Sequence, residues 1–296
     1  MNLLITGGTG FIGSALCTRL LNNKKHELTI LSRNPESIKI PAKAISNLNQ
    51  LEKDASFDVI INLAGEPIAD NRWTEKHKQK IIRSRINTTE KIIEYIKAAK
   101  HKPELLINGS AIGYYGINKT NNAIDENGTD DNSFSSELCK QWETVALQAN
   151  SFGIRTCLLR TGIVLGTNAG ALKKMLPPFK MGLGGKIGSG QQWMSWIHLD
   201  DLVGIILYCI EHDDLKGPIN GTSPNPSTNK DFTKTLGKVL NRPTFISIPE
   251  IIIKLLMGQM GVELLLSGKK ILPIKISEKG YQFQYPTLEN ALKNIL

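Results

Sequence analysis

The sequence predicts an α/β protein with a Rossmann-type, doubly wound parallel sheet and a smaller, mainly helical C-terminal substrate lobe. Strand-like apolar runs alternate with helix-like segments through the first half of the 296-residue chain, which is typical of a parallel sheet covered on both faces. A glycine-rich turn joins the first strand to the first helix. After about residue 165 the alternation stops, and glycine, proline and methionine become frequent. We therefore expect a first domain at 1–165 and a substrate-binding lobe at 166–296.

The strands expected in the first half are short and nearly continuous apolar runs, as a sheet buried on both faces requires. They are expected at residues 2–6, 28–32, 57–63, 105–108 and 154–159. Three longer segments between them are predicted to be helices, at residues 11–22, 74–99 and 134–150.

The segment at 34–56 is too short for a complete helix–strand–helix excursion. It can hold a short strand near Ala44 and Ile45 and one short helix at most. We therefore expect the sheet to be trimmed after its second strand. Beyond residue 165, helix-like segments recur at 201–211, 229–240, 251–257 and 287–295.

The composition argues against several classes of protein. A hydrophobic content of 41% and a charged content of 21% are ordinary for a soluble globular chain. No basic segment with a long apolar run precedes the first strand, so no signal peptide is expected. The longest apolar runs, at 203–210 and 251–257, are too short to span a bilayer. We expect no membrane partner. The four cysteines are scattered without a CxxC pair, which favours reduced thiols in a cytoplasmic protein.

The net charge of +9 has two interpretations. A basic chain attracts phosphates of nucleotides or nucleic acids, whereas a lysine-rich surface needs no such partner. The charge is spread along the chain, with one denser stretch at 72–85, and no zinc-finger or RRM signature accompanies it. We expect no nucleic-acid partner and assign most of the charge to a solvated face.

The strongest local motif is "TGGTGFIG", in which Gly7, Gly10 and Gly13 lie three residues apart between a strand and a helix. The first glycine allows a sharp turn, the second a close approach to a pyrophosphate, and the third close packing of the helix. The phosphate would lie at the helix N-terminus, where free N–H groups favour an anion. The motif predicts a dinucleotide site.

The end of the second strand decides which dinucleotide is expected. NAD-specific sites place a carboxylate there, which accepts a hydrogen bond from the ribose 2′-hydroxyl. This chain has Ser32 and Arg33 instead, and both can donate to a 2′-phosphate. We therefore predict NADP(H) as the cofactor. The alternative is that Arg33 is a solvated surface arginine.

Several motifs occur in one order along the chain: "TGGTGFIG", "NLAG", "YYG", "LLRTGIVLG" and "WIHLDDLV". This combination resembles the extended short-chain dehydrogenase/reductase superfamily. The stretch "NLAGEPIADNRWT" and the ending "KGYQFQYPTLENAL" resemble, more narrowly, its atypical NADP-binding "epimerase family" subgroup, which is sugar-nucleotide-epimerase-like.

The resemblance implies cofactor contacts beyond the glycines. Those expected around the pyrophosphate are Thr9, Gly10, Phe11 and Ile12. Leu63 and Ala64 would contact the cofactor after the third strand, unless they form an ordinary strand-end turn. Arg85 would point toward the cofactor from its helix, unless it is a solvated arginine, and Val164 would lie near the nicotinamide.

The resemblance also implies that residues near 193–212 return to the core domain. His198 with Asp200 and Asp201 is only weakly metal-like, and Asp200 is a good helix N-cap residue. We therefore expect helix capping and no metal site here.

The usual catalytic pair of the superfamily, Tyr-x-x-x-Lys, is absent. Alignment on Glu143 places Ser135 at the tyrosine position and Cys139 at the lysine position. Lys140 is one residue away, which turns it about 100° from the required face of a helix. A serine alcohol is a poor proton donor, and a cysteine cannot replace the charge of lysine.

Three other hydroxyls remain as candidates for proton transfer, namely Ser110, Tyr114 and Tyr115 in "NGSAIGYYG". They follow a strand at the edge of the sheet where ligands bind. The usual serine position itself holds Ala111. The alternative is that both tyrosines form the wall of a pocket.

Two functions remain open. One is an NADP(H)-dependent oxidoreductase or epimerase acting on a small hydroxy or carbonyl compound, of which a nucleotide sugar is one example. The other is a non-catalytic NADPH-binding protein that senses redox state or docks a partner. A homodimer through the helices at 74–99 and 134–150 is a superfamily-level expectation.

Overall fold

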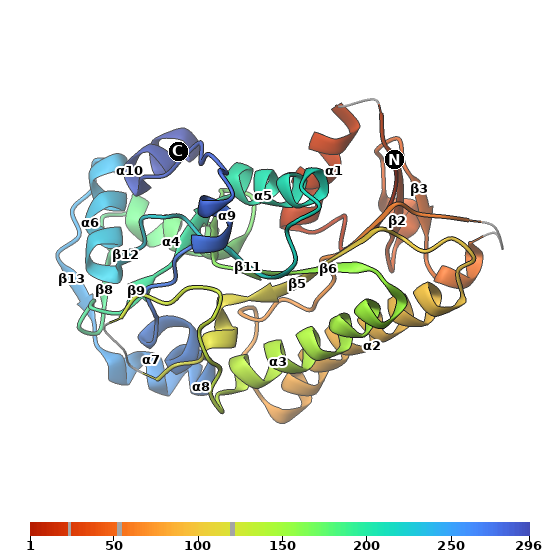
Figure 1. The fold of residues 1–296 in the computed structure, drawn as a ribbon. Coiled ribbons are helices and arrows are strands. Elements are labelled where there is room, and N and C mark those ends of the chain that lie inside the picture. The colour runs from red at the N-terminus through yellow and green to blue at the C-terminus, as the bar shows by residue number, and fades with distance from the viewer. Residues whose placement is uncertain (23–24, 52–54, 119–121) are drawn as a thin grey trace.

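The computed structural model describes residues 1–22, 25–51, 55–118 and 122–296. Within these residues the centre is a seven-stranded parallel sheet in the order β11–β6–β5–β4–β1–β2–β3 (Figure 1). Its strands are β1 (Asn2–Thr6), β2 (Glu27–Leu31), β3 (Lys43–Ile45), β4 (Val59–Asn62), β5 (Leu105–Ala111), β6 (Arg155–Thr161) and β11 (Gly217–Gly221). The strand order reverses between β1 and β4, which is the switch point of a doubly wound sheet. The predicted fold class is confirmed.

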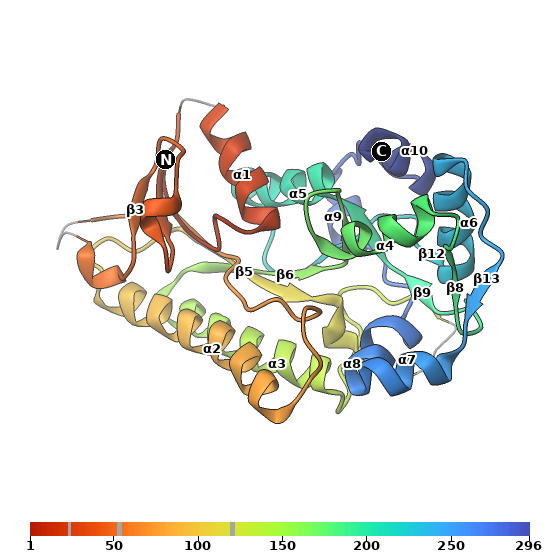
Figure 2. The same cartoon turned by 180° about the vertical axis from the view of Figure 1, so that it is seen from behind.

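Helices cover both faces of this sheet. Helices α1 (Phe11–Asn22) and α5 (Leu199–Glu211) lie on one face, and α2 (Glu75–Ala98) and α3 (Phe134–Ala146) lie on the other (Figures 1 and 2). The residues of β1 show why both faces must be covered. Its Leu3 and Ile5 pack on the α1–α5 side, whereas Leu4 packs on the α2–α3 side. Strand β1 therefore buries every residue except Asn2, with neighbouring side chains on opposite faces.

The sheet is trimmed after β2, as predicted. Strand β3 is three residues long and lies between two short 3-10 turns, Pro35–Ser37 and Leu48–Gln50. The helix expected at 134–150 is shorter as an α-helix, because α3 ends at Ala146. The chain continues as a 3-10 helix, Leu147–Phe152, to Gly153 with φ +76°.

The C-terminal lobe stands beyond the carboxyl ends of the strands (Figure 1). Its larger helices are α4 (Gly170–Lys180), α6 (Asn229–Leu240), α7 (Glu250–Met257) and α10 (Leu288–Ile295), and its short ones are α8 (Gln259–Gly261) and α9 (Ile274–Glu278). Short strands pair as β7 (Ile163–Leu165) with β10 (Trp196–His198), β8 (Gly185–Ile187) with β13 (Ile246–Ile248), and β9 (Trp193–Met194) with β12 (Ser227–Thr228). The lobe has its own core around Phe179, Trp196 and Phe232.

The chain returns from the lobe to the sheet at α5, which packs against α1, and then adds β11 beside β6. Strand β11 was not expected from the sequence. The prediction that Asp200 caps α5 is wrong. His198 is the N-cap residue, and its Nδ1 accepts a hydrogen bond from the Asp200 amide at 3.0 Å. An imidazole can therefore fill a position for which a carboxylate was expected.

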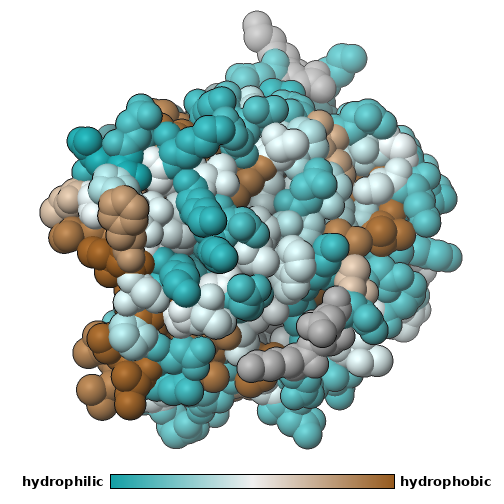
Figure 3. Space-filling view, turned by 90° about the vertical axis from the view of Figure 1, so that its left-hand side faces the viewer, coloured by the Kyte–Doolittle hydropathy of each residue, from teal (hydrophilic) through white to brown (hydrophobic). Residues whose placement is uncertain are grey.

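Two surface properties of the described residues complete the fold. None of their helices combines the length and the apolarity needed to cross a bilayer. Apolar surface nevertheless gathers along one edge of the face that carries β13 and α7 (Figure 3).

Candidate functional site

The glycine loop has the geometry expected of a phosphate-binding turn. Gly7 has φ +70°, and a Cβ there would lie 2.7 Å from the Leu63 carbonyl. A Cβ on Gly13 would lie 2.2 Å from the Gly7 oxygen, so both positions exclude a side chain. A Cβ on Gly10 would meet only the Gly7 oxygen, at 3.1 Å, among the described atoms. The outer surface at Gly10 is therefore open to a phosphate, which fits a dinucleotide.

The sheet brings the other predicted cofactor residues beside this loop. Strands β2 and β4 flank β1 in parallel, with Thr6 opposite Leu31 and Asn62. Ser32 and Arg33, and Leu63 and Ala64, therefore follow at the same edge. Arg33 is exposed, and the Ser32 hydroxyl accepts a hydrogen bond from the Asn34 amide at 3.2 Å. Their contacts with the cofactor stay a prediction.

Arg85 lies beneath the loop that follows β4. Its Nη1 donates to the carbonyl oxygens of Glu66, at 3.1 Å, and Ile81, at 3.2 Å. Burial lowers the pKa of its guanidinium, and the group lies 5.2 Å from the Trp142 ring centroid. In these contacts Arg85 supports the loop at 64–66. A direct contact with the cofactor stays a prediction.

A buried polar network, which the sequence did not reveal, joins the ends of β1 and β4 to the middle of β5 and to α2. The Thr6 hydroxyl donates to Asn62 Oδ1 at 2.6 Å, and Asn62 Nδ2 donates to Asn108 Oδ1 at 2.6 Å and Thr89 Oγ1 at 2.9 Å. Thr6 Oγ1 also accepts from the Ala64 amide at 3.2 Å. The network fixes the ends of β1 and β4 relative to β5 and α2.

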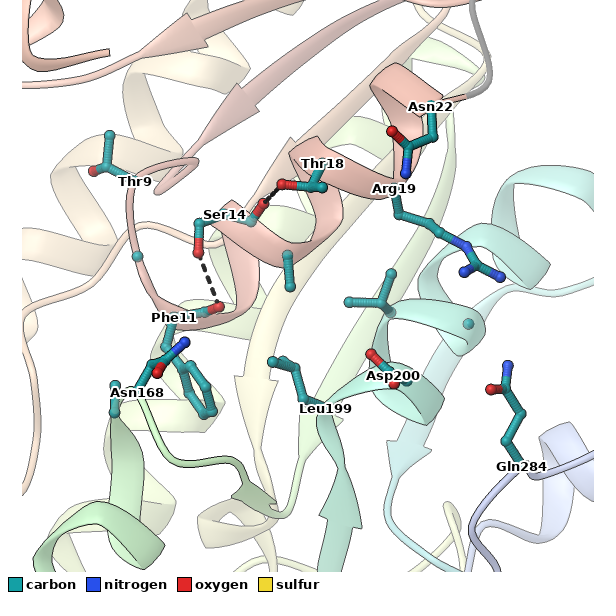
Figure 4. Close-up of a pocket in the computed structure, with 15 residues that line it drawn as sticks. Thr9, Phe11, Ser14, Thr18, Arg19, Asn22, Asn168, Leu199, Asp200 and Gln284 are labelled. Atoms are coloured by element: carbon teal, nitrogen blue, oxygen red, sulfur yellow. Dashed lines mark hydrogen bonds between the residues drawn. The ribbon is translucent and has the colours of Figure 1, made fainter. Parts of the chain in front are cut away.

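An open groove of about 630 Å³ begins at the glycine loop and runs between α1 and α5 (Figure 4). Thr9, Gly10 and Phe11 lie at one end, and Arg19 and Asn22 lie farther along α1. Ser32, Arg33, Leu63 and Ala64 do not line it. The groove therefore shares only the glycine loop with the predicted cofactor edge.

The two positions of the missing catalytic pair are engaged in internal contacts. The Ser135 hydroxyl donates to Glu263 Oε2 at 2.7 Å, and the Ser135 amide donates to the same oxygen at 2.9 Å. The Glu263 carboxylate comes from the lobe and lies at the N-terminus of α3, where a negative charge is favourable. Cys139 is buried, which raises its thiol pKa to about 11. Neither residue is placed for proton exchange.

Ser110 belongs to a buried ion-pair network. Its hydroxyl donates to Glu143 Oε1 at 2.6 Å. Arg160 binds the same carboxylate with two hydrogen bonds, Nε to Oε1 at 2.8 Å and Nη2 to Oε2 at 2.9 Å. Burial disfavours the charged guanidinium, but the hydrogen bonds and charge of Glu143 raise the pKa of Arg160 overall. The Ser110 proton is directed into this pair, and its role in proton transfer stays a prediction.

The two tyrosines have different environments. Tyr115 is 0% exposed, and its hydroxyl donates to Asn220 Oδ1 at 2.6 Å while accepting from Arg160 Nη1 at 3.1 Å. Burial raises the pKa of Tyr115 to about 12, against the opposing effect of Arg160. Tyr114 is half-buried, with the Arg160 guanidinium 3.4 Å from its ring centroid. Tyr115 is therefore enclosed, whereas Tyr114 is the more accessible of the two tyrosines. The role of either in proton transfer stays a prediction.

Residues of the lobe close the site from the other side. Val164 belongs to β7, directly after β6, and is half-buried. A Cβ on Gly166 would lie 2.7 Å from the Phe11 ring, so the glycine loop packs against the lobe.

The described residues contain no group of His, Cys, Asp and Glu side chains suited to a metal ion.

One sequence signal could have revealed part of the ion-pair network around Arg160. Arg160 interrupts the apolar strand "CLLRTG", and a buried arginine needs a carboxylate partner. Glu263 and Asn220 carry no comparable signal, because they meet Ser135 and Tyr115 at separations of 128 and 105 residues.

Comparisons with known proteins give a consistent result. The model of the NAD dependent epimerase/dehydratase family matches residues 3–220, and a domain of unknown function (DUF1731) matches residues 248–295. The chain is 39% identical to "Epimerase family protein YfhF" of Bacillus subtilis, covering 100% of this chain and 98% of that protein. It is 38% identical to "Epimerase family protein SDR39U1 homolog, chloroplastic" of Arabidopsis thaliana, covering 100% of this chain and 87% of that protein.

A solved structure is also similar. The crystal structure of human epimerase family protein SDR39U1 (isoform 2) with NADPH superimposes with a TM-score of 0.88 at 36% identity. The match covers 100% of this chain and 99% of that chain.

Proposed function

We propose that this chain, which belongs to the NAD dependent epimerase/dehydratase family, binds NADP(H) and acts as an oxidoreductase or epimerase on a small hydroxy or carbonyl compound. A nucleotide sugar is one such compound. The observation that carries the proposal is the glycine loop with Ser32 and Arg33 at the neighbouring strand end. The NADPH bound to the similar human protein supports the same cofactor. Bound NADP(H) would supply or accept the hydride.

Replacing Arg33 by Ala tests the cofactor. A hydrogen bond to a charged group contributes about 1.5–3 kcal/mol, so NADPH binding should weaken about tenfold to a hundredfold. NADH lacks the 2′-phosphate, and its binding should not change. The two affinities are measured by fluorescence titration.

Arg83→Ala provides the matched control, because Arg83 is an exposed arginine on α2 and should affect neither cofactor. Equal losses for NADPH and NADH in Arg33→Ala would contradict a role at the 2′-phosphate.

Proton transfer is the second step to test. We assign it to Tyr114, because the hydroxyls of Ser110 and Tyr115 are bound within the protein. A general acid contributes about a hundredfold or more, so Tyr114→Phe should slow oxidation of bound NADPH by at least that factor. The measurement is single-turnover absorbance of bound NADPH against a panel of carbonyl compounds.

Tyr115→Phe is the control for the same hydroxyl deletion. It should lower stability, because Asn220 and Arg160 lose a buried partner, while turnover per folded molecule stays the same. Loss of turnover in Tyr115→Phe but not in Tyr114→Phe would assign proton transfer to Tyr115 instead.

A non-catalytic NADPH-binding protein is the second candidate function. The observation that favours it is that the hydroxyls of Ser135 and Ser110 are hydrogen-bonded within the protein and the Cys139 thiol is buried. Tight NADPH binding by the wild-type chain without turnover of any compound in the panel would support this candidate.

The location and assembly of the protein are part of the proposal. All four cysteines, Cys17, Cys139, Cys157 and Cys209, are free and buried, which suits a reducing compartment such as the cytoplasm. We keep a homodimer through α2 and α3 as the proposed assembly, and no nucleic-acid partner is proposed.

A further inference from the structure

Exposed apolar side chains are concentrated on the C-terminal lobe. Among the described residues eleven large hydrophobic side chains are exposed, and eight of them lie in three neighbouring segments of the lobe. We call these eight the apolar patch: Met181, Leu183, Phe245, Ile246, Ile251, Ile252, Leu255 and Leu256. Single exposed apolar residues are ordinary, whereas a contiguous group marks an interaction surface.

The three segments lie next to one another. Strands β8 and β13 are paired in parallel, so the residues that precede them lie side by side. A Cβ on Gly182 would lie 3.6 Å from Pro243, and a Cβ on Gly188 would lie 2.7 Å from Glu250 at the start of α7. Figure 3 shows apolar surface in two groups at the left edge of this face, with paler residues between them.

Helix α7 exposes most of its apolar side chains, whereas an ordinary surface helix buries them. Ile253 is its buried residue, while Ile251 and Leu255 are 73% and 75% exposed. Phe245, just before β13, is 93% exposed. Outward apolar side chains beside basic ones are typical of helices that lie in the plane of a membrane surface.

The charge around the patch indicates what covers it. The segments 170–190 and 229–263 contain nine lysines and arginines but three acidic residues, a net charge of +6 within the +9 of the whole chain. Two of these lysines, Lys174 and Lys238, pair with Asp70 and Glu289 from outside the segments, which leaves a net charge of +4. Lys180, Arg242 and Lys254 are exposed beside the patch. Lys254 Nζ lies 3.6 Å from Glu250 Oε2, and Arg242 Nε donates to the Lys180 carbonyl at 2.9 Å. A second copy on this face would place like charges together, whereas an anionic lipid surface would complement them.

We propose that the apolar patch and its basic rim bind the surface of an anionic lipid bilayer. Helix α7 would lie in the headgroup layer, with Phe245 inserted beside it. This inference goes beyond the proposed function and departs from the sequence-based expectation of no membrane partner. It requires no spanning helix, because the contact is peripheral.

The test is co-sedimentation of the full chain with vesicles of phosphatidylcholine alone or mixed with phosphatidylglycerol. We expect binding to the mixed vesicles that weakens as salt is added. The double replacement Leu255→Ser and Leu256→Ser should weaken binding at least about tenfold. Removing one charge of the basic rim, as in Arg242→Ala, should weaken vesicle binding about fivefold.

The matched control is Leu147→Ser, because Leu147 is also an exposed leucine, at 38%, but follows α3 on the other domain. It should bind vesicles like the wild type. NADPH affinity, measured on every variant, should stay constant and reports on folding independently of lipid. Absence of binding to mixed vesicles, or equal losses in the control, would overturn the proposal. Concentration-dependent self-association that is lost in the double variant, without vesicle binding, would assign the patch to a second copy instead.

Discussion

Replacing Glu143 by Gln is expected to lower the free energy of unfolding by about 3–5 kcal/mol, because it leaves a buried guanidinium without its counter-charge. Glu143 and Arg160 are 5% and 2% exposed and are joined by two hydrogen bonds. Glutamine keeps the shape and one acceptor oxygen but removes the charge. Urea denaturation followed by two spectroscopic probes measures the effect.

Two controls separate the charge from the loss of a side chain. The double replacement of Glu143 by Leu and Arg160 by Met removes both charges, so it should be much less destabilising than Glu143→Gln alone. Glu289→Gln removes the charge from two surface ion pairs, with Lys238 at 2.8 Å and Lys293 at 2.7 Å, and should have little effect. If Glu143→Gln were as harmless as Glu289→Gln, the buried pair would not be the element that secures the ends of β5 and β6.

The first half of the fold could be predicted because its signals are local. Alternating apolar strands and the glycine turn specify β1, α1 and the trimmed excursion without reference to distant residues. The edge strand β11 escaped prediction because "GPING" contains glycine and proline and has few apolar residues. It becomes a strand through its pairing with β6, which no local pattern records.

The candidate site also has one part that the local sequence predicts and another that depends on distant residues. The loop at Gly7–Gly13 and the Ser32–Arg33 pair follow strands directly, so their positions could be inferred from the sequence. The environment of Tyr115 could not, because its partners Arg160 and Asn220 are 45 and 105 residues away. The same holds for Ser135, whose hydroxyl meets Glu263 at a separation of 128 residues. A hydroxyl in a motif therefore indicates chemistry only when its partners are known.

Replacing Gly13 by Ala is expected to impair both stability and cofactor binding. The new Cβ would lie 2.2 Å from the Gly7 oxygen and 2.8 Å from Gly8 Cα. These neighbours are backbone atoms, so no change of rotamer relieves the clash, and the loop must separate from α1. Overpacking of this kind costs about 1–3 kcal/mol, measured as a lower urea midpoint, and NADPH affinity should fall because the loop is displaced.

Gly10→Ala is the matched variant that separates the two effects. Its Cβ would meet only the Gly7 oxygen, at 3.1 Å, among the described atoms, so the urea midpoint should stay close to that of the wild type. The same Cβ would occupy the surface that a pyrophosphate must approach, so NADPH binding should weaken at least about tenfold. Unchanged NADPH affinity in Gly10→Ala would show that the pyrophosphate does not cross the loop there. Loss of stability equal to that of Gly13→Ala would show instead that Gly10 serves the packing of the turn.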